Sequence, residues 1–140
     1  MPKITKTPKK LTYTYAVGRR KEATARIRLF HGKGESLVNG MASDKYFPGK
    51  LALINFQKPF TVTDSLNKFY ATIKVAGSGK NGQLTAVMHG LSRALDKFNP
   101  ETYHKSLKQA DLLTRDPRTR ERRKIGMGGK SRRAKQSPKR

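Results

Sequence analysis

The chain has 140 residues and a formal net charge of +23, from 32 basic and 9 acidic side chains, and it has no cysteine. This length suits one modest domain with extensions. The lack of cysteine excludes disulfides and thiolate zinc sites, and no apolar run approaches the roughly 18 residues of a membrane span. So large an excess of positive charge favours a nucleic acid as partner.

The first third of the chain predicts strands. Residues 13–17 are rich in Tyr and Thr, which predicts a strand that stops at Gly18. In residues 23–30, small and apolar side chains alternate with Thr and Arg, so we expect a second strand with one buried and one cationic face. The glycine-containing turn at 31–34 then predicts a hairpin with a short strand at 35–38.

The middle of the chain holds one ambiguous segment and one clear strand. Residues 50–56 suit either a short helix or a buried apolar segment that ends before Pro59, and periodicity does not separate the two over so few residues. Residues 69–76 alternate again between apolar and polar side chains, which predicts a strand.

Two helices are predicted after this strand. Apolar side chains in residues 84–98 recur at helical spacing and predict the longest helix. Asn99 suits the cap and Pro100 the first turn of a second helix, and order is expected to fade after Leu113. The polar side of the first helix carries three basic side chains four residues apart, which we expect to form an outward-facing ridge. These are His89, Arg93 and Lys97.

Strands early in the chain and helices late predict the α+β fold class, with a small, mostly antiparallel sheet of about four strands and helices packed on one face. We divide the chain into a disordered basic arm at 1–12, a globular RNA-binding domain at 13–113 and an extended basic tail at 114–140. From residue 115 onward the tail has twelve basic and two acidic side chains, a net charge of +10. Such a segment buries too little apolar surface to fold alone, so it needs a polyanion.

Two glycine motifs suggest nucleotide chemistry, and neither has the required context. Residues 77–82 fit G-x-G-x-x-G between a strand and a helix, but the acid that should follow, Asp96, lies in the same helix and no strand comes after it. A tight turn that brings the backbone close to a neighbour is favoured there. Residues 129–131 resemble the end of a Walker loop, but Lys124 stands at its first glycine position.

The remaining chemistry-bearing residues give no catalytic centre. Acidic side chains are few and isolated, so a general acid–base pair is hard to assemble. The three histidines are not spaced for a metal site. They are His31, His89 and His104. We therefore predict no enzyme activity, no cofactor and no metal.

The basic clusters predict contacts with phosphates. Lysine and arginine neutralise phosphates whatever the nucleic-acid sequence, and the Arg19-Arg20-Lys21 run sits on a tight connection after a strand. The tail lacks aromatic residues, and the strands carry no aromatic RNA-recognition signature. We therefore expect folded RNA or a duplex, held through its backbone.

Several stretches together resemble the universal small-subunit ribosomal protein family conventionally numbered nine, of bacterial or organellar type. They are residues 16–26 (AVGRRKEATAR), 89–95 (HGLSRAL) and 113–124 (LTRDPRTRERRK), with Lys139-Arg140 at the end. The resemblance spans about residues 13–140, and the order of the motifs is highly specific. The chain departs from the family at Asp111, where glycine is common, so a slightly strained turn is expected.

The resemblance implies a structural protein that is ribosome-bound in the bacterial cytoplasm or in an organelle. Its implied fold contains an unusual left-handed βαβ crossover. Its implied partners are the small-subunit ribosomal RNA, neighbouring ribosomal proteins of the subunit head and peptidyl-site transfer RNA, with no membrane and no homo-oligomer. Ribosomal RNA binding falls to Arg19, Arg20, Lys21, Arg118, Arg120, Arg122, Arg123, Lys124, Lys130, Arg132 and Arg133, and transfer RNA binding to Lys139 and Arg140.

The last five residues depart from the family's usual Gln-Phe-Ser-Lys-Arg ending. Gln136-Ser137-Pro138 precedes Lys139-Arg140, so an aromatic is lost and the proline stiffens the tip. Two other functions remain open on the residues alone. The second interpretation is a free basic protein that compacts DNA or RNA, and the third is a nucleotide-dependent enzyme using the loop at 77–82.

Overall fold

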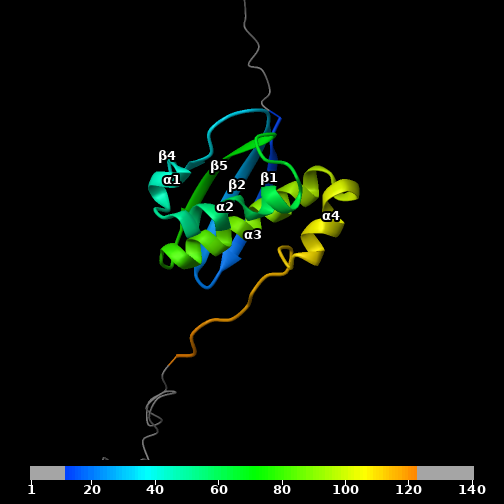
Figure 1. Ribbon diagram of the computed structural model, residues 1–140. Coiled ribbons are helices and arrows are strands. Elements are labelled where there is room, and N and C mark those ends of the chain that lie inside the picture. Colours follow the sequence, from blue (N-terminus) through cyan, green and yellow to red (C-terminus); the bar gives the residue numbers. More distant parts are fainter. Residues whose placement is uncertain (1–11, 123–140) are drawn as a thin grey trace, which may run out of the picture.

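The computed structural model describes residues 12–122, and its elements form two layers (Figure 1). In chain order they are β1 (Thr14–Arg20), β2 (Ala23–His31), β3 (Leu37–Val38), β4 (Met41–Ala42), α1 (Ser43–Tyr46), α2 (Lys50–Val62), β5 (Phe69–Ala76), α3 (Lys80–Phe98) and α4 (Pro100–Gln109). Helix α3 packs across β1 and β2, and α2 and α4 flank α3. The predicted α+β class is confirmed. Nearly all of the predicted arm and the tail from Arg123 onward lie outside the described residues.

The sheet has five strands in the order β1-β2-β5-β3-β4. All neighbours pair antiparallel except β3 and β5, which are parallel and are joined through β4, α1 and α2. The sheet is thus mostly antiparallel, as predicted. It has one strand more than predicted, because β4 is only two residues long and shows no alternation that a sequence pattern can reveal.

The predicted hairpin between residues 23–30 and 35–38 is wrong. Strand β2 pairs with β1 on one side and with β5 on the other, over eight residue pairs in the latter case. No edge of β2 is left, so β3 lies beyond β5 and pairs with it over two residues only. The hairpin is formed instead by β1 and β2, which Lys21 and Glu22 connect, with Lys21 at a φ of 51°. Strand β1 also continues past Gly18 to Arg20.

Residues 50–56 are helical, and their helix continues through Pro59 rather than ending before it. A proline inside a helix removes one backbone hydrogen bond and crowds the preceding turn. Here the Pro59 ring is fully buried, together with Phe56 and Phe60, and this burial offsets the lost bond. The hydroxyl of Thr63 then closes the helix end by donating to the carbonyl oxygen of Pro59 at 2.9 Å.

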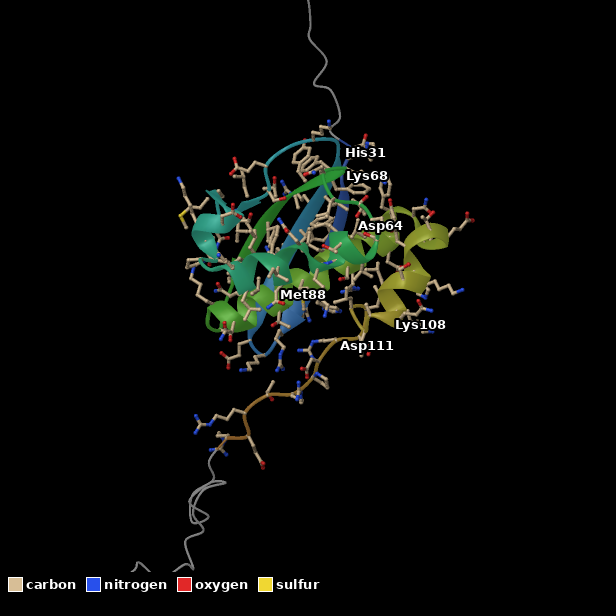
Figure 2. The ribbon with its side chains drawn as sticks, in the orientation of Figure 1. His31, Asp64, Lys68, Met88, Lys108 and Asp111 are labelled. Atoms are coloured by element: carbon tan, nitrogen blue, oxygen red, sulfur yellow. The ribbon has the colours of Figure 1, made fainter. Side chains whose placement is uncertain are left out.

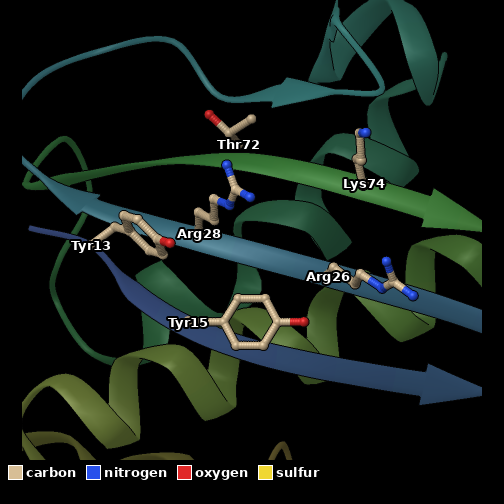
Figure 3. A pocket seen from close by; sticks show the side chains of 6 residues that line it. All are labelled: Tyr13, Tyr15, Arg26, Arg28, Thr72 and Lys74. Atoms are coloured by element: carbon tan, nitrogen blue, oxygen red, sulfur yellow. The ribbon is translucent and has the colours of Figure 1, made fainter. Parts of the chain in front are cut away.

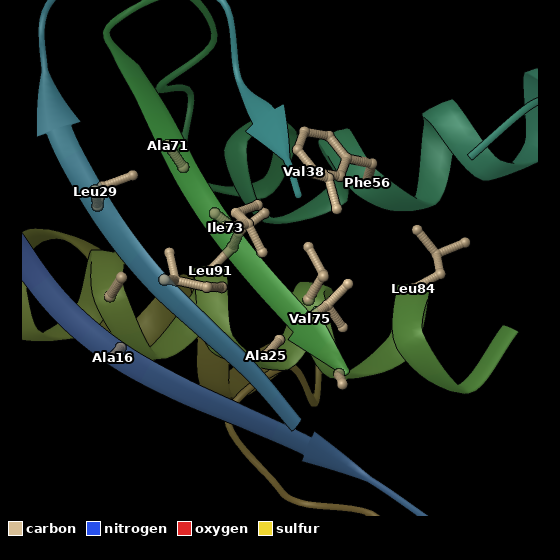
Figure 4. Close-up of a cluster of buried hydrophobic side chains, with 14 of the residues drawn as sticks. Ala16, Ala25, Leu29, Val38, Phe56, Ala71, Ile73, Val75, Leu84 and Leu91 are labelled. Atoms are coloured by element: carbon tan, nitrogen blue, oxygen red, sulfur yellow. The ribbon is translucent and has the colours of Figure 1, made fainter. Parts of the chain in front are cut away.

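The core lies between the sheet and the helices (Figure 4). The alternating side chains of β2 and β5 supply its sheet side, as predicted, and one stripe of α3 supplies the other side. Its largest fully buried aliphatic side chains are Ile27, Leu29, Ile73, Leu91, Leu95, Leu107, Val38 and Val87.

Two glycines let the backbones of β1 and α3 touch. A Cβ added to Gly18 would overlap the carbonyl oxygen of Ala86 and the backbone nitrogen of Gly90. A Cβ added to Gly90 would lie 2.6 Å from Cδ1 of Ile27 and 2.9 Å from the nitrogen of Gly18. Any side chain here would push the helix away from the strand, so only glycine allows this approach.

The chain turns away from α4 between Lys108 and Asp111 (Figure 2), and its backbone hydrogen bonds there form a Schellman motif. The Leu112 nitrogen donates to the Leu107 carbonyl at 3.1 Å, and the Asp111 nitrogen donates to the Lys108 carbonyl at 3.1 Å. Leu107 and Leu112 are both buried, which is the apolar contact that accompanies this motif. Asp111 takes a φ of 54°, a left-handed conformation for which glycine is the usual residue, so the expected strain is confirmed.

We expect Gly18→Ala to lower the free energy of unfolding by about 3 kcal/mol, because the added methyl meets backbone atoms that have no rotamer to adjust. Gly79→Ala is the matched control, since a Cβ there meets nothing within 4 Å, and its effect should stay under about 1 kcal/mol. Urea unfolding of both variants measures the difference. Equal stabilities would show that α3 and β1 are not held at this distance by Gly18.

Candidate nucleic-acid interface

The face of the sheet opposite the helices is open and basic (Figure 3). Because side chains alternate along each strand, the residues that leave β2 and β5 on this face are the polar and basic ones. They surround a hollow of about 520 Å³. It is lined by Tyr13, Tyr15, Arg26, Arg28, Thr72 and Lys74. We call this hollow the sheet hollow.

The sheet hollow places like charges side by side. Arg26 and Lys74 are direct cross-strand partners of β2 and β5, and Arg28 follows two residues along β2. Like charges directly opposite each other on a sheet are destabilising. In the described part of the chain, none of these three cations has a carboxylate partner. An anion in the hollow would relieve this repulsion.

A row of aromatic rings begins at Tyr13, which lines the sheet hollow. The rings of Tyr13 and Phe30 lie 5.7 Å apart, and those of Phe30 and Tyr70 stack at 5.1 Å. The Arg28 guanidinium lies 5.4 Å from the centre of the Tyr13 ring, within cation–π distance. Gly34 fits against the Tyr70 ring, where a Cβ would lie 2.8 Å from it. These rings hold one another in place.

Two further hollows continue the basic surface around β1. The first, of about 630 Å³, shares Arg26, Thr72 and Lys74 with the sheet hollow and extends it to Arg19. The second, of about 610 Å³, lies beyond the outer edge of β1 and is lined by Val17, Arg19, His89, Arg93 and Arg115. Arg19 borders both, so the three hollows form one surface, which we call the basic band.

The predicted ridge on α3 lies along the free edge of β1, where its side chains make hydrogen bonds. Its outward position is confirmed for Arg93 and Lys97, which are exposed, while His89 is partly buried. Lys97 donates to the carbonyl of Tyr15 at 3.4 Å and Arg93 to that of Val17 at 2.6 Å. The backbone nitrogen of Arg19 donates to Nδ1 of His89 at 3.4 Å. Four residues of a helix rise about 6 Å, and two residues of a strand advance about 6.7 Å. Side chains four residues apart on α3 therefore meet backbone groups two residues apart on β1.

His89 also connects the edge of β1 to the segment after α4. Since Nδ1 accepts from Arg19, Nε2 carries the proton and donates to the carbonyl of Leu113 at 3.3 Å. Burial lowers the pKa of His89, and the nearby cations Arg93 and Arg115 lower it further against the opposing effect of the Leu113 carbonyl. His89 is therefore held neutral, and this contact positions Arg115 beside the basic band.

The start of the C-terminal segment is fixed by one carboxylate between two arginines. Arg20 pairs with Asp116 at 3.3 Å and donates to the carbonyl of Arg118 at 2.5 Å. Arg118 donates to the Asp116 carboxylate from its backbone nitrogen at 3.1 Å and from Nη2 at 2.8 Å. The hydrogen bonds from Arg118, with the charges of Arg118 and Arg20, hold the pKa of Asp116 far below its usual range. The pairing of Asp116 with Arg20 and Arg118 fixes the direction of the segment, which runs past the β1–β2 turn (Figure 1).

The structure places some of the predicted site residues on the basic surface and gives one of them, Arg20, a different role. Arg19 lies at the centre of the basic band, and Lys21 is exposed at the β1–β2 turn. Arg20 is only 15% exposed and holds Asp116 instead of facing solvent. The predicted residues Arg118, Arg120 and Arg122 of the C-terminal segment are exposed. The predicted residues outside the described range are Arg123, Lys124, Lys130, Arg132, Arg133, Lys139 and Arg140.

Sequence reasoning missed the aromatic part of the sheet hollow. It noted the cationic outer face of residues 23–30 but not that Tyr13 and Tyr15 join the same face. The signal was present, because β1 alternates with Ala16 and Gly18 buried, so Tyr15 must point to the other side. Lys74 likewise follows from the alternation of β5.

The glycine loop at 77–82 has a packing role. Gly77 has a φ of 82°, and a Cβ on it would overlap the carbonyl oxygen of Glu22, so this loop packs against the β1–β2 turn. Strand β5 is antiparallel to β2, no strand follows α3 up to residue 122, and Asp96 pairs with His104 at 2.7 Å, which is not a dinucleotide-binding arrangement. Within residues 12–122 no three His, Asp or Glu side chains gather as metal ligands, and no helix has the length and apolarity for crossing a bilayer.

Comparison with known proteins agrees with this geometry. Residues 18–140 match the model of the family described as ribosomal protein S9/S16. The chain is also 46% identical over 117 residues to the small ribosomal subunit protein uS9 of Maridesulfovibrio salexigens. That alignment covers 84% of this chain and 89% of the relative.

The lowered pKa of His89 predicts a loss of stability in mild acid. The folded state favours neutral His89, so the unfolded chain binds more protons between the folded pKa and the ordinary value of about 6.5. The contribution is complete above that value and is lost as pH falls through the folded pKa. His89→Gln keeps an acceptor and a donor without titrating, so its stability should fall less than that of the wild type between pH 8 and pH 5.

Thermal unfolding at both pH values measures this difference. The variant and the wild type are first compared at pH 8, where both side chains are neutral and any loss of packing is seen by itself. The assignment to His89 is rejected if the two proteins lose the same stability on acidification.

Proposed function

The chain belongs to the ribosomal protein S9 family, and from this membership we propose that it is a structural constituent of the small ribosomal subunit, seated on the ribosomal RNA of the subunit head. The family is not enzymatic, and its members act in translation as RNA-binding proteins of the cytoplasmic ribosome. Neighbouring ribosomal proteins are further partners.

The basic band is the observation that supports RNA binding most directly. It runs from the sheet hollow around the β1 edge to Arg115, and no acidic residue among residues 12–122 lines any of its three hollows. The carboxylate of Asp116, in the segment that follows Arg115, is already paired with Arg20 and Arg118. Cations without internal partners neutralise phosphates and release counterions.

Within this proposal the predicted residues have two roles. Arg19 and Lys21 bind ribosomal RNA from the rigid domain, while Arg20 positions the C-terminal segment and so binds RNA less directly. Arg118, Arg120 and Arg122 bind RNA from that segment. The predicted RNA contacts further along are Arg123, Lys124, Lys130, Arg132 and Arg133. The proposed division stays a basic arm at 1–12, a globular domain at 13–113 and a basic tail at 114–140.

The end of the tail reaches peptidyl-site transfer RNA in this proposal, through Lys139 and Arg140. The support is the family membership, since the match runs to residue 140. An extended chain advances about 3.3 Å per residue, so the 18 residues after Arg122 can span up to about 60 Å. That reach is enough to separate a transfer RNA contact from the domain that binds ribosomal RNA.

The proposal predicts that the protein in a cell extract sediments with small ribosomal subunits at moderate salt. Affinity for isolated small-subunit RNA should fall with salt, and removing all residues after Arg122 should make that dependence shallower, since phosphate contacts are lost. A predominantly free or nucleoid-bound pool would instead support a general nucleic-acid-compacting protein.

Deletion of Lys139 and Arg140 should leave assembly into subunits intact and weaken transfer RNA at the peptidyl site. Because two cations are lost, up to about two fewer counterions should be released on binding, so the slope of log affinity against log salt should be shallower by up to about two. Filter binding of transfer RNA to purified subunits measures the effect. Substituting Lys105, an exposed lysine of α4, by Gln is the control for a simple loss of charge. Unchanged transfer RNA affinity in the deletion would remove the tip from the proposal.

A further inference from the structure

We infer that the sheet hollow binds an unpaired nucleotide of RNA, with the ring of Tyr15 stacked on its base and Arg26, Arg28 and Lys74 on its phosphates. This inference deepens the proposed function, since it names the form of RNA that one part of the basic band recognises. It differs from the expectation of folded RNA or a duplex held only through its backbone.

Tyr15 is the free ring of the sheet hollow. It is 43% exposed, whereas its neighbours Tyr13, Phe30 and Tyr70 are engaged in the aromatic row. In the described part of the chain, the Tyr15 ring makes neither a ring contact nor a hydrogen bond, and its backbone carbonyl accepts from Lys97. Figure 3 shows this ring along β1, beside the hollow that Arg26 and Arg28 also border.

The strand beneath Tyr15 is rigid, which suits a stacking platform. Its carbonyl is held by Lys97, and β1 is fixed on α3 by the contact of Gly18 with Gly90. A ring on such a backbone loses little conformational freedom when a base stacks on it. Every base offers a π-face, so stacking requires no particular sequence.

The cations next to Tyr15 fit the other half of a nucleotide. Arg28 is its direct cross-strand partner on β2, so a base on the ring leaves its phosphate within reach of Arg28. Arg26 and Lys74 stand opposite each other, two residues further along the strands, and have no carboxylate partner among residues 12–122. An RNA strand supplies a base for the ring and phosphates for the paired cations at once.

A duplex or an acidic protein segment satisfies only part of this surface. In a duplex the bases are stacked within the helix, so the Tyr15 ring would have no base to meet. An acidic segment would neutralise Arg26 and Lys74 but leave the exposed ring without a flat partner. Single-stranded RNA, by contrast, is commonly bound by aromatic rings on the open face of a sheet.

The test compares Tyr15→Leu with Tyr15→Phe in the full chain, because leucine removes the ring and phenylalanine keeps it. The probe is a fluorescent single-stranded RNA of about 12 nucleotides, a length within the site sizes of such surfaces. Tyr15→Leu should weaken its binding by roughly tenfold, and Tyr15→Phe should bind like the wild type. The same RNA annealed to its complement should bind both variants equally.

A second pair of variants separates stacking from charge. Arg26→Gln should weaken both single-stranded and duplex RNA, and Lys105→Gln on α4 should weaken either much less. The chain has no tryptophan, so quenching of tyrosine fluorescence by the single strand, absent in Tyr15→Leu, reports the stacked ring. Thermal unfolding confirms that each variant is folded.

Three results would overturn the inference. They are equal binding of the single strand by Tyr15→Leu and the wild type, a duplex preference that depends on Tyr15, and ultraviolet cross-linking of Tyr15 to a protein in assembled subunits. If the wild type assembles into subunits and one of these results is found, only the inference fails. If the wild type does not join small subunits, the proposed function itself fails.

Discussion

The contact between Gly18 and Gly90 determines where the other parts of the interface lie. Because the two backbones touch, α3 runs close enough to β1 for side chains four residues apart to reach its free edge. One of these, His89, then holds Leu113, and so fixes where the chain goes after α4. A helix a few ångströms further away would leave the edge open and the C-terminal segment without this support. The position of a basic segment thus depends on the absence of two methyl groups.

The sheet has two faces with different roles. One face packs on α3 and supplies the apolar core, while the other carries unpaired cations and aromatic rings. Placing Arg26 opposite Lys74 lowers stability in the free protein, since like charges repel across strands. The domain tolerates this because the core lies on the other side, out of reach of these charges. Natural sequences break a local rule of this kind most often where a partner completes the site.

Much of this fold was predictable from alternation and helical spacing. Strand β5 and helices α3 and α4 follow from the sequence, because each has a long periodic pattern or a clear cap such as Asn99. The errors have local causes. Strand β3 has only two paired residues, so its partner depends on tertiary packing, and the burial of Pro59 overrides its tendency to end a helix.

The site was predictable in its charge but not in its geometry. The Arg19-Arg20-Lys21 run reads as one basic cluster in the sequence, yet alternation along β1 sends Arg19 and Arg20 to opposite faces of the sheet. The spacing of residues in α3 predicts an amphipathic helix with a basic side. Only the close approach of Gly18 to Gly90 shows that these basic side chains meet a strand. Spacing cannot reveal such contacts between residues 70 or more positions apart.

The covered edge of β1 also matters for the chain before it meets any RNA. A long strand with free backbone groups is a template on which another chain can add a strand and begin aggregation. Here Lys97, Arg93 and His89 occupy three of those groups, the carbonyls of Tyr15 and Val17 and the nitrogen of Arg19, and the opposite edge of the sheet, β4, is only two residues long. A newly made, highly cationic protein that must wait for its RNA is therefore protected from pairing with its own copies through the described sheet.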